Sequence, residues 1–299
     1  MSGDHEKSSD KPLAPGLYLV ATPIGNLEDI TLRALRILRS VDRIACEDTR
    51  QTQKLLNHFE IHTPTVSYHL HNEGTRTEEL TEELKRGARI AVVSDAGTPG
   101  IADPGGQIAA AAIAAGIDVF PVPGANAAIS GLIASGLPAE RFTFHGFLPA
   151  KAGQRKTTLE ELVRGEVTQG EVTHIFYEAP HRILDTLADI EAVFGTSQHI
   201  VVARELTKLH EEFLRGTVGE VRSQLAARST VRGEIVLMLA PSPALSPSEK
   251  RASLAVEVAA LMKSEGISEM DALKRVARER GIGKSEAYRE LQREQNRLR

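Results

Sequence analysis

The chain has 299 residues, of which 41% are hydrophobic, and its formal net charge is −4. This length supplies enough apolar material for a large core and predicts about two domains of roughly 100–200 residues each. No run approaches the roughly 18 apolar residues of a membrane span, and the single cysteine, Cys46, has no partner for an intramolecular disulfide. Composition therefore disfavours membrane and disulfide-stapled proteins and predicts a globular, cytoplasmic protein.

Residues 1–15 are charged and lack the apolar segment of a secretory signal, so we expect a short disordered tail there. Charge is unevenly distributed over the rest of the chain. Residues 246–299 hold 12 Lys and Arg against 9 Asp and Glu, whereas the first 245 hold 24 against 31. The basic C-terminal segment indicates contact with a polyanion, although a solvated helical face gives the same pattern.

Apolar strands alternate with amphipathic helices through the first half of the chain, which is typical of a mostly parallel sheet covered by helices. The predicted strands are 17–22, 42–47, 89–94, 118–124 and 141–146, and the predicted helices are 31–40, 52–59, 77–87, 105–116 and 126–136. We therefore expect a first α/β domain over 16–147.

The polar stretch 147–166 is interpreted as the boundary to a second α/β domain over 148–243. Its expected strands are 173–178, 199–205, 211–217 and 233–240, with helices at 181–195 and 218–227. Several of these strands follow one another without a long crossover, which favours a mixed or partly antiparallel sheet. Residues 244–299 are expected to form a linker, rich in proline and serine near 241–250, and a small basic all-α segment of three helices.

Three glycine- or proline-rich loops follow predicted strands and precede predicted helices: "ATPIGNLEDIT" at 21–31, "VVSDAGTPGIADPG" at 92–105 and "VPGANAA" at 122–128. Open α/β sheets bind ligands at the carboxyl ends of their strands. Neither G-x-G-x-x-G nor G-x-x-x-x-G-K-[ST] is present, so the common dinucleotide and P-loop fingerprints are absent. A generic turn remains the alternative for any single loop.

Together with "CEDTRQTQKLL", "SYHLHNE", "FHGFLP", "FYEAPHRI" and "VARELTKLHEE", these loops make the stretch 16–240 resemble the ribosomal small subunit RNA methyltransferase I family of the tetrapyrrole methylase superfamily. The resemblance implies two α/β domains with a cofactor cleft between them, usually in a homodimer. It implies transfer of a methyl group from S-adenosylmethionine to the ribose 2′-oxygen of a cytidine in the decoding region of 16S rRNA, within the small ribosomal subunit.

The same resemblance implies which residues bind S-adenosylmethionine. Many superfamily members have G-D-P in the central loop, where this chain has Gly97, Thr98 and Pro99, as in the RNA-modifying branch. Asp103 has an alternative interpretation as an N-cap, because Asp directly before Pro often starts a helix. The implied cofactor-binding residues are Pro23, Gly25, Asp95, Ala96, Gly97, Thr98, Ile101, Asp103, Ala125, Asn126, Phe176, Tyr177 and Ala203.

A ribose hydroxyl is a weak acid, so methyl transfer to it needs a group that accepts its proton or orients it. Polar side chains after the predicted strands also have structural alternatives: helix caps for Glu47 to Arg50, and ion pairs for the arginines. Thr49, His69, Asn72, Glu205 and Lys208 belong to the wider set. The predicted catalytic residues are Glu47, Asp48, Arg50, Glu73, Arg182 and Arg204.

His69 and His71 form an H-x-H pattern, but no cysteine completes a metal site and this methyl transfer needs no metal, so none is predicted. RNA contact is predicted from two basic patches: Lys151, Arg155 and Lys156, and a tail resembling a helix-turn-helix with Lys274, Arg275, Arg278, Arg280 and Lys284. Its alternative is a helical hairpin without an RNA role. Two other functions stay open: a tetrapyrrole methyltransferase and a non-enzymatic ribosome-binding factor.

Overall fold

A computed structural model describes residues 12–169, 172–241, 254–280, 283–284, 287–289 and 291–292. Residues 1–11, most of the expected tail, and 242–253, most of the expected linker, lie outside the described residues. Chain contacts separate two compact units, with the division between residues 242 and 243. Each unit is considered by itself.

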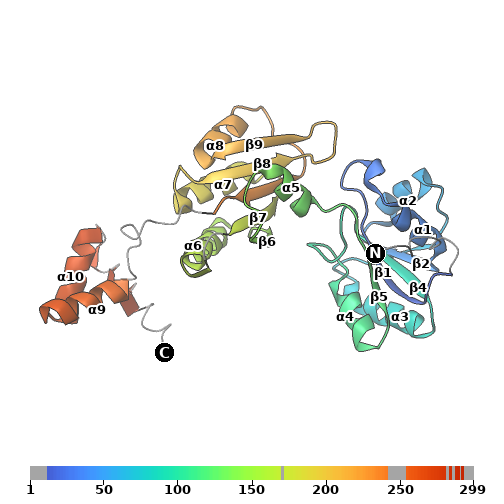
Figure 1. Cartoon of the computed structure of the whole chain (residues 1–299), viewed down its shortest axis with the longest axis horizontal. Helices are drawn as coiled ribbons and strands as arrows, with labels where there is room; N and C mark the ends of the chain where they lie inside the picture. Colours follow the sequence, from blue (N-terminus) through green and yellow to red (C-terminus); the bar gives the residue numbers. More distant parts are fainter. Residues whose placement is uncertain are drawn as a thin grey trace, which may run out of the picture. The chain divides into compact units, whose positions relative to one another are not determined.

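The first sheet of the larger unit is fully parallel, with strand order β3-β2-β4-β1-β5 (Figure 1). Its strands are β1 (Gly16–Val20), β2 (Arg43–Cys46), β3 (Thr65–Ser67), β4 (Arg89–Val93) and β5 (Val119–Val122). Because the strands are parallel, the loops that follow β1, β2, β4 and β5 all leave the same edge of the sheet.

Helices cover both faces of this sheet. The helices α1 (Leu32–Ser40) and α2 (Thr49–His58) pack on one face, and α3 (Glu73–Lys85) and α4 (Gly106–Ala114) pack on the other. Strand residues alternate between the two cores: Tyr18 packs with α1, and Leu17 packs with α3 and α4. The Thr31 side chain caps α1 by accepting from the Ala34 N–H.

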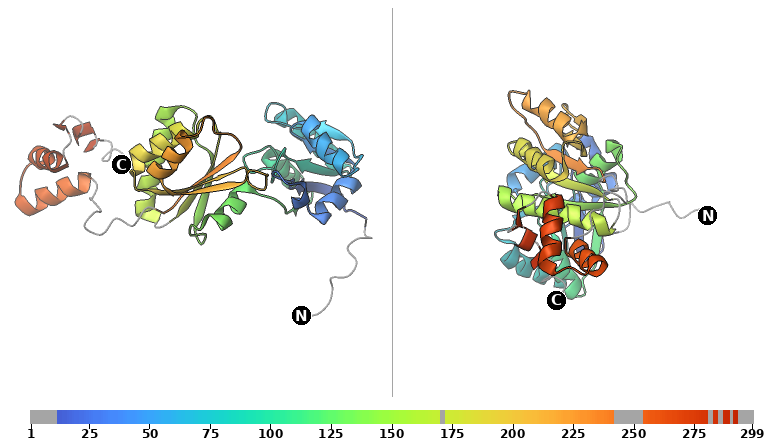
Figure 2. Two further views of the ribbon diagram at one scale, coloured as in Figure 1. Left: turned by 90° about the horizontal axis from the view of Figure 1, so that it is seen from above. Right: turned by 90° about the vertical axis from the view of Figure 1, so that its left-hand side faces the viewer.

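The second sheet is mixed, as predicted, with the order β6-β7-β10-β8-β9. Its strands are β6 (Phe142–Phe147), β7 (Thr173–Glu178), β8 (His199–Arg204), β9 (Glu212–Thr217) and β10 (Ile235–Leu239). Only the pair of β6 and β7 is parallel. Helices α6 (Ala152–Gln169), α7 (Ile183–Phe194) and α8 (Val218–Ala226) cover one face, and α5 (Ala127–Ser135) packs on the other (Figure 2).

Three expectations about these elements were wrong. Strand β6, expected in the first sheet, pairs with β7 in the second, because its alternating pattern does not specify a partner. The polar stretch expected as a boundary forms α6, whose Leu159 is fully buried. The short strand β3 was not predicted, since three residues carry too little periodicity.

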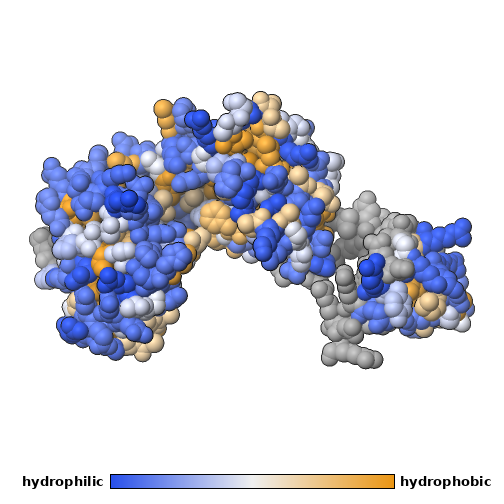
Figure 3. All heavy atoms as spheres, turned by 180° about the vertical axis from the view of Figure 1, so that it is seen from behind, coloured by the Kyte–Doolittle hydropathy of each residue, from blue (hydrophilic) through white to orange (hydrophobic). Residues whose placement is uncertain are grey.

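Apolar side chains are buried between the helices and the sheets, and hydrophilic side chains cover most of the surface of the described residues when it is seen from behind (Figure 3). In the part of the chain that the structure describes, no helix is long and apolar enough to span a bilayer.

The smaller unit is helical, as predicted. Its helices α9 (Leu254–Glu265) and α10 (Glu269–Arg280) pack together with Ala287 and Leu291 around one apolar cluster. The cluster consists of Leu254, Val258, Ala272, Leu273, Val276, Ala277, Ala287 and Leu291.

Candidate functional site

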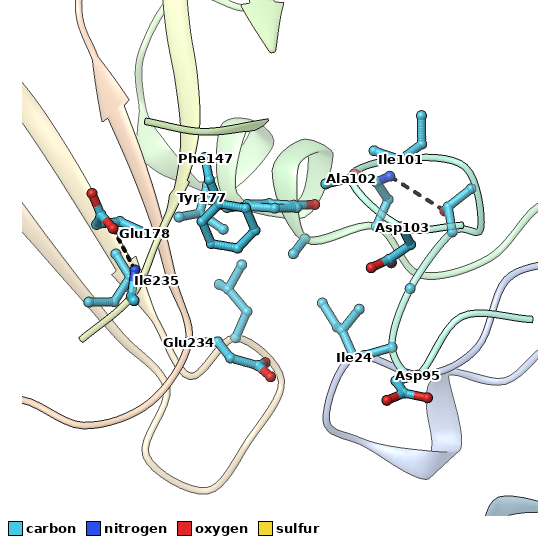
Figure 4. Close-up of a pocket in the computed structure, with 18 of the residues that line it drawn as sticks. Ile24, Asp95, Ile101, Ala102, Asp103, Phe147, Tyr177, Glu178, Glu234 and Ile235 are labelled. Atoms are coloured by element: carbon cyan, nitrogen blue, oxygen red, sulfur yellow. Dashed lines mark hydrogen bonds between the residues drawn. The ribbon is translucent and has the colours of Figure 1, made fainter. Parts of the chain in front are cut away.

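A pocket of about 440 Å³ lies where the carboxyl edge of the first sheet meets the second sheet (Figure 4). The first sheet contributes the loops after β1, β2 and β4, and the second contributes the end of β7 and the start of β10. In Figure 4, Ile24, Asp95 and Asp103 lie across the cavity from Tyr177 and Glu234. The volume falls in the range of small-molecule sites.

Nine residues named from the sequence line this pocket: Glu47, Asp95, Ala96, Gly97, Thr98, Ile101, Asp103, Asn126 and Tyr177. The central loop therefore lies where its position after a parallel strand indicated. Asp103 does not cap α4, because the N-cap of that helix is Gly105.

Backbone hydrogen bonds fix the central loop against its neighbours. Thr22 and Gly97 exchange two of them, with N···O distances of 2.8 and 3.0 Å. Gly97 has φ +86°, and a Cβ there would lie 3.3 Å from Ile24 Cγ2, so glycine suits both the conformation and the close approach. Thr98 donates through Oγ1 to the Ala125 carbonyl at 3.1 Å, while Asn126 caps α5. The loop therefore presents a preformed wall.

The first loop packs closely against the β8–β9 connection, which supplies Leu206 to the pocket. A Cβ on Gly25 would lie 2.4 Å from Lys208 Cγ and 3.1 Å from the Leu206 carbonyl oxygen. The Asn26 N–H also donates to Thr207 Oγ1 at 3.1 Å. Glycine at position 25 thus allows the two walls to meet.

Substituting Gly25→Ala is expected to lower the free energy of unfolding by about 1–3 kcal/mol, because the added methyl group overpacks this contact. Urea denaturation measures the change. The matched control is Gly74→Ala in α3, where a Cβ meets nothing within 4 Å and helix propensity favours alanine. Equal stability of Gly25→Ala and the wild type would contradict the close packing.

Carboxylates dominate the polar lining of the pocket. Among the described lining residues there are five carboxylates, Glu47, Asp95, Asp103, Glu178 and Glu234, and no Lys, Arg or His. Glu178 pairs with Arg182 and Glu234 pairs with Lys208, both at 3.1 Å. Asp95 accepts a hydrogen bond from the Asp48 N–H at 3.0 Å. Glu47, Asp95 and Asp103 face the cavity and form no ion pair among the described residues, although the His69 charge acts on Glu47 against the rise in pKa that burial causes.

The pKa values of Asp103 and Glu47 reflect this concentration of negative charge. Burial raises the pKa of Asp103 to about 6, and the charges of Glu47 and Asp95 add to the effect. Burial also raises the pKa of Glu47, again assisted by Asp95. Crowded carboxylates oppose one another's ionisation, and a bound cation relieves that repulsion. The site favours a positively charged ligand and disfavours a polyphosphate.

Apart from Thr98 and Asn126, the remaining lining side chains are mostly apolar. The Phe147 and Tyr177 rings meet edge to face with their centroids 5.7 Å apart. Ile24 comes from the first loop, and Val236 from β10. A ligand with a flat apolar part and a cationic part matches this division.

Other residues predicted to bind the cofactor do not line the pocket. Pro23, Gly25 and Ala125 lie next to lining residues, as the contacts of Gly25 and Ala125 show. Phe176 and Ala203 are fully buried in the two cores on opposite faces of the second sheet.

Of the six predicted catalytic residues, Glu47 lines the pocket and five lie outside its lining. Asp48 caps α2 and pairs with Arg50 at 3.2 Å. The Glu73 carboxylate accepts from the Tyr68 hydroxyl and from the Gly105 N–H. The two remaining arginines bond to carboxylates and carbonyls: Arg182 to Glu178 and Leu148, and Arg204 to Glu212 and Arg232.

Sequence reasoning missed the lining that comes from the second sheet and from loop neighbours. The missed residues are Ile24, Ala102, Ala127, Phe147, Glu178, Ala179, Pro180, Leu206, Glu234, Ile235 and Val236. Antiparallel pairing sets Ile235 opposite Glu178. Only the position of 179–180 directly after a strand offered a signal.

Of the basic patch predicted around Arg155, Lys151 and Lys156 are exposed, whereas Arg155 itself is not. Arg155 is buried, with Nη2 2.6 Å from Asp189, and Lys156 lies 3.4 Å from the same carboxylate. In α10, Lys274 and Arg275 pair with Asp271 and Glu265. The side chain of Arg280 lies outside the described residues. Across the described chain, no group of three His, Cys, Asp or Glu side chains is arranged to hold a metal.

Comparison with known proteins adds to this geometry. The family model "Tetrapyrrole (Corrin/Porphyrin) Methylases" matches residues 16–222. A protein of Halalkalibacterium halodurans named ribosomal RNA small subunit methyltransferase I is 48% identical over 91% of this chain and 93% of its own length. Proteins of the same name from Synechocystis and Bacillus subtilis are 47% and 45% identical, each over 91% of this chain and over 95% and 92% of their own lengths.

Solved structures show the same fold at low sequence identity. Diphthine synthase aligns with a TM-score of 0.59 at 13% identity, over 75% of this chain and 89% of its own. The methyltransferase CobJ aligns with a TM-score of 0.56 at 17% identity, over 77% of this chain and 95% of its own. The chain therefore belongs to the tetrapyrrole methylase family and, within it, to the group named ribosomal RNA small subunit methyltransferase I.

Proposed function

We propose that this protein transfers a methyl group from S-adenosylmethionine to the ribosomal RNA of the small subunit, at the ribose 2′-oxygen of a cytidine in the decoding region of 16S rRNA. The observation that carries the proposal is the acidic pocket, formed by the loops whose motifs resemble this family. The names of the closely similar relatives support the RNA substrate. Homodimer formation and action on an assembled subunit belong to the same proposal.

S-adenosylmethionine fits the chemistry of the pocket. Its sulfonium and ammonium groups are positive, and Glu47, Asp95 and Asp103 supply negative charge without a competing cation among the lining residues. Its adenine suits the apolar side of the pocket with Phe147 and Tyr177. Methyl transfer leaves a neutral thioether in place of the sulfonium, so the acidic lining holds the product less tightly than the substrate.

For the transfer itself, the ribose oxygen forms a bond to the methyl carbon as the carbon–sulfur bond breaks, and the hydroxyl proton goes to a base. Alignment of oxygen, carbon and sulfur supplies much of the catalysis. We assign the base to Glu47, because it is the one predicted catalytic residue that lines the pocket and its pKa is raised by burial.

Substituting Asp95→Asn is expected to weaken S-adenosylmethionine binding about 10- to 100-fold, because a charge-assisted contact is worth roughly 1.5–3 kcal/mol. Calorimetry measures the affinity. Transfer of labelled methyl groups to small subunits lacking the modification, with the labelled nucleotide mapped, measures the reaction. The control is Asp118→Asn, which removes an exposed carboxylate remote from the pocket lining.

The outcomes separate the competing functions. Label on a cytidine 2′-oxygen, reduced by Asp95→Asn but not by Asp118→Asn, is expected. Binding of the cofactor with transfer only to a tetrapyrrole would replace the RNA acceptor with a small molecule. Binding of subunits without binding of the cofactor would make the protein a non-enzymatic ribosome-binding factor.

A further inference from the structure

The outer face of α1 presents a row of arginines. Arg33, Arg36 and Arg39 recur every three residues, while Ala34, Ile37 and Leu38 are buried against the sheet. Arg33 and Arg39 are exposed and Arg36 is partly exposed. At 1.5 Å rise per residue the row extends over about 9 Å along one helix.

These arginines differ from most basic residues around them. None of the ion pairs among the described residues involves Arg33, Arg36 or Arg39, and of their side chains only that of Arg39 donates a hydrogen bond, to the Phe59 carbonyl at 2.8 Å. By contrast, Arg43 pairs with Glu83, and Arg89 with Asp42. The three positive charges of the row are therefore not neutralised by described carboxylates.

The neighbouring surface extends this positive charge. Helix α2 covers the same sheet face as α1 (Figure 1). Its exposed Lys54 bonds only to the neutral Gln51. Burial raises the pKa of the Tyr18 hydroxyl, whereas the charges of Arg36 and Arg33 both act on that hydroxyl to lower its pKa. Two acidic residues, Glu28 and Asp29, precede α1 in the chain.

This face is connected to the pocket through both helices. The loop that leads into α1 contains Ile24, eight residues before the helix begins, and α2 begins two residues after Glu47. Helices that follow parallel strands begin at the carboxyl edge of the sheet, so α1 and α2 both start on the side of the sheet where the pocket opens.

We infer that Arg33, Arg36 and Arg39 bind backbone phosphates of the RNA substrate, holding it as its acceptor nucleotide enters the pocket. This inference rests on the proposed function. Arginine suits the role because its planar fork donates two hydrogen bonds to a phosphate. Because the chain as a whole is acidic, its attraction for RNA depends on such local groups.

Arg33→Glu/Arg36→Glu tests the inference in the full-length protein. We expect the affinity for unmodified small subunits to fall at least tenfold. The slope of log affinity against log salt concentration should decrease in magnitude by about 1.4–1.8, because each of the two phosphate contacts contributes roughly 0.7–0.9. S-adenosylmethionine binding and the thermal transition should remain as in the wild type. Arg33→Gln/Arg36→Gln should give the same direction with a smaller loss.

Two single variants, Arg36→Glu and Arg86→Glu, control for the change in net charge, because each substitution changes the charge of the protein by the same amount. Arg86 is exposed at the end of α3, which covers the other face of the first sheet. Arg36→Glu should weaken RNA binding, and Arg86→Glu should not. Equal losses from both, or an unchanged salt slope in the double variant, would overturn the inference while leaving the proposed function intact. A wild type that binds cofactor but neither binds nor methylates RNA would remove the proposed function itself, and this inference with it.

Discussion

Substituting Asp103→Asn is expected to stabilise the empty protein and, at the same time, to weaken its binding of S-adenosylmethionine. In the folded protein, burial and then the charges of Glu47 and Asp95 raise the pKa of Asp103 from 3.8 to about 6. A carboxyl group with a raised pKa is harder to ionise in the folded state than in the unfolded state. Its ionisation therefore costs stability, and that cost is fully present above pH 6.

The raised pKa of Asp103 also determines how the stability of the fold depends on pH. As the pH rises from about 4 to about 6, the wild type loses stability through Asp103, and below pH 4 the residue contributes nothing. Asparagine removes the cost, so Asp103→Asn should gain about 1 kcal/mol at pH 7, well below the full 1.36 kcal/mol per pKa unit, because Asp103 is only partly buried and solvent screens its charge. Near pH 4 the gain should vanish.

Cofactor binding should change in the opposite direction. Without the Asp103 charge, we expect the affinity for S-adenosylmethionine at pH 7 to fall at least tenfold. The wild-type affinity should also decrease as the pH is lowered through 6, and the variant should lack that component. Urea denaturation at pH 7 and pH 4 and calorimetry at both pH values measure these effects. A variant less stable than the wild type at pH 7, with Asp118→Asn unchanged, would contradict the assignment.

Such a gain and loss would mean that the pocket stores electrostatic repulsion that its ligand relieves. Glu47, Asp95 and Asp103 come from loops after β2 and β4, so the parallel sheet itself brings them to one edge. A site that is destabilising when empty and stabilised by its ligand is a common relation between stability and function.

Much of the lining from the first sheet was predictable, whereas from the second sheet only Tyr177 was predicted. Parallel strands deliver their loops to one edge, so strand ends read from the sequence place the central loop and Glu47 correctly. Glu234 and Ile235 reach the pocket because β10 pairs antiparallel with β7. That pairing joins segments more than fifty residues apart, and local sequence patterns do not predict which distant strands pair.

Alternation along a strand explains why only one of two neighbouring predicted residues lines the pocket. Phe176 and Tyr177 were both predicted to bind the cofactor, but successive strand residues point to opposite faces of a sheet. Tyr177 faces the pocket, and Phe176 is buried against the helices of the other face. The motif identified the strand, whereas the choice between its faces required the positions of α5 and of the first sheet.

The predicted arginines form ion pairs that the sequence alone does not reveal. A sequence shows that a residue is charged and lies in a polar stretch, but it does not show which carboxylate pairs with it. Arg155, Arg182 and Arg204 each have a carboxylate partner, whereas the arginines of α1, which the sequence analysis did not single out, have none among the described residues. Basic residues that form no ion pair within the fold are the better candidates for RNA contacts.

Replacing Arg155 with alanine should therefore act on stability rather than on RNA binding. Arg155 is 4% exposed, and its Nε lies 2.7 Å from an Asp189 oxygen. Its Nη1 donates to the Ala150 carbonyl at 3.2 Å, which fixes the start of α6. Truncation leaves the Asp189 charge buried, with only Lys156 nearby at 3.4 Å. We expect a loss of about 3–5 kcal/mol in the free energy of unfolding, measured by urea denaturation.

The double variant Arg155→Leu/Asp189→Leu distinguishes this role from an RNA contact. It removes both charges and fills the site with apolar groups, so it should recover most of the stability that Arg155→Ala loses, because a buried pair replaced by packed side chains costs little. Its RNA affinity should equal that of the wild type, whereas Lys156→Ala should change stability much less. If the double variant were stable but bound RNA tenfold more weakly, Arg155 would contact RNA as its sequence context predicted. Wild-type affinity in the double variant would instead mean that the guanidinium holds α6 to α7, and that charge in this patch serves the fold.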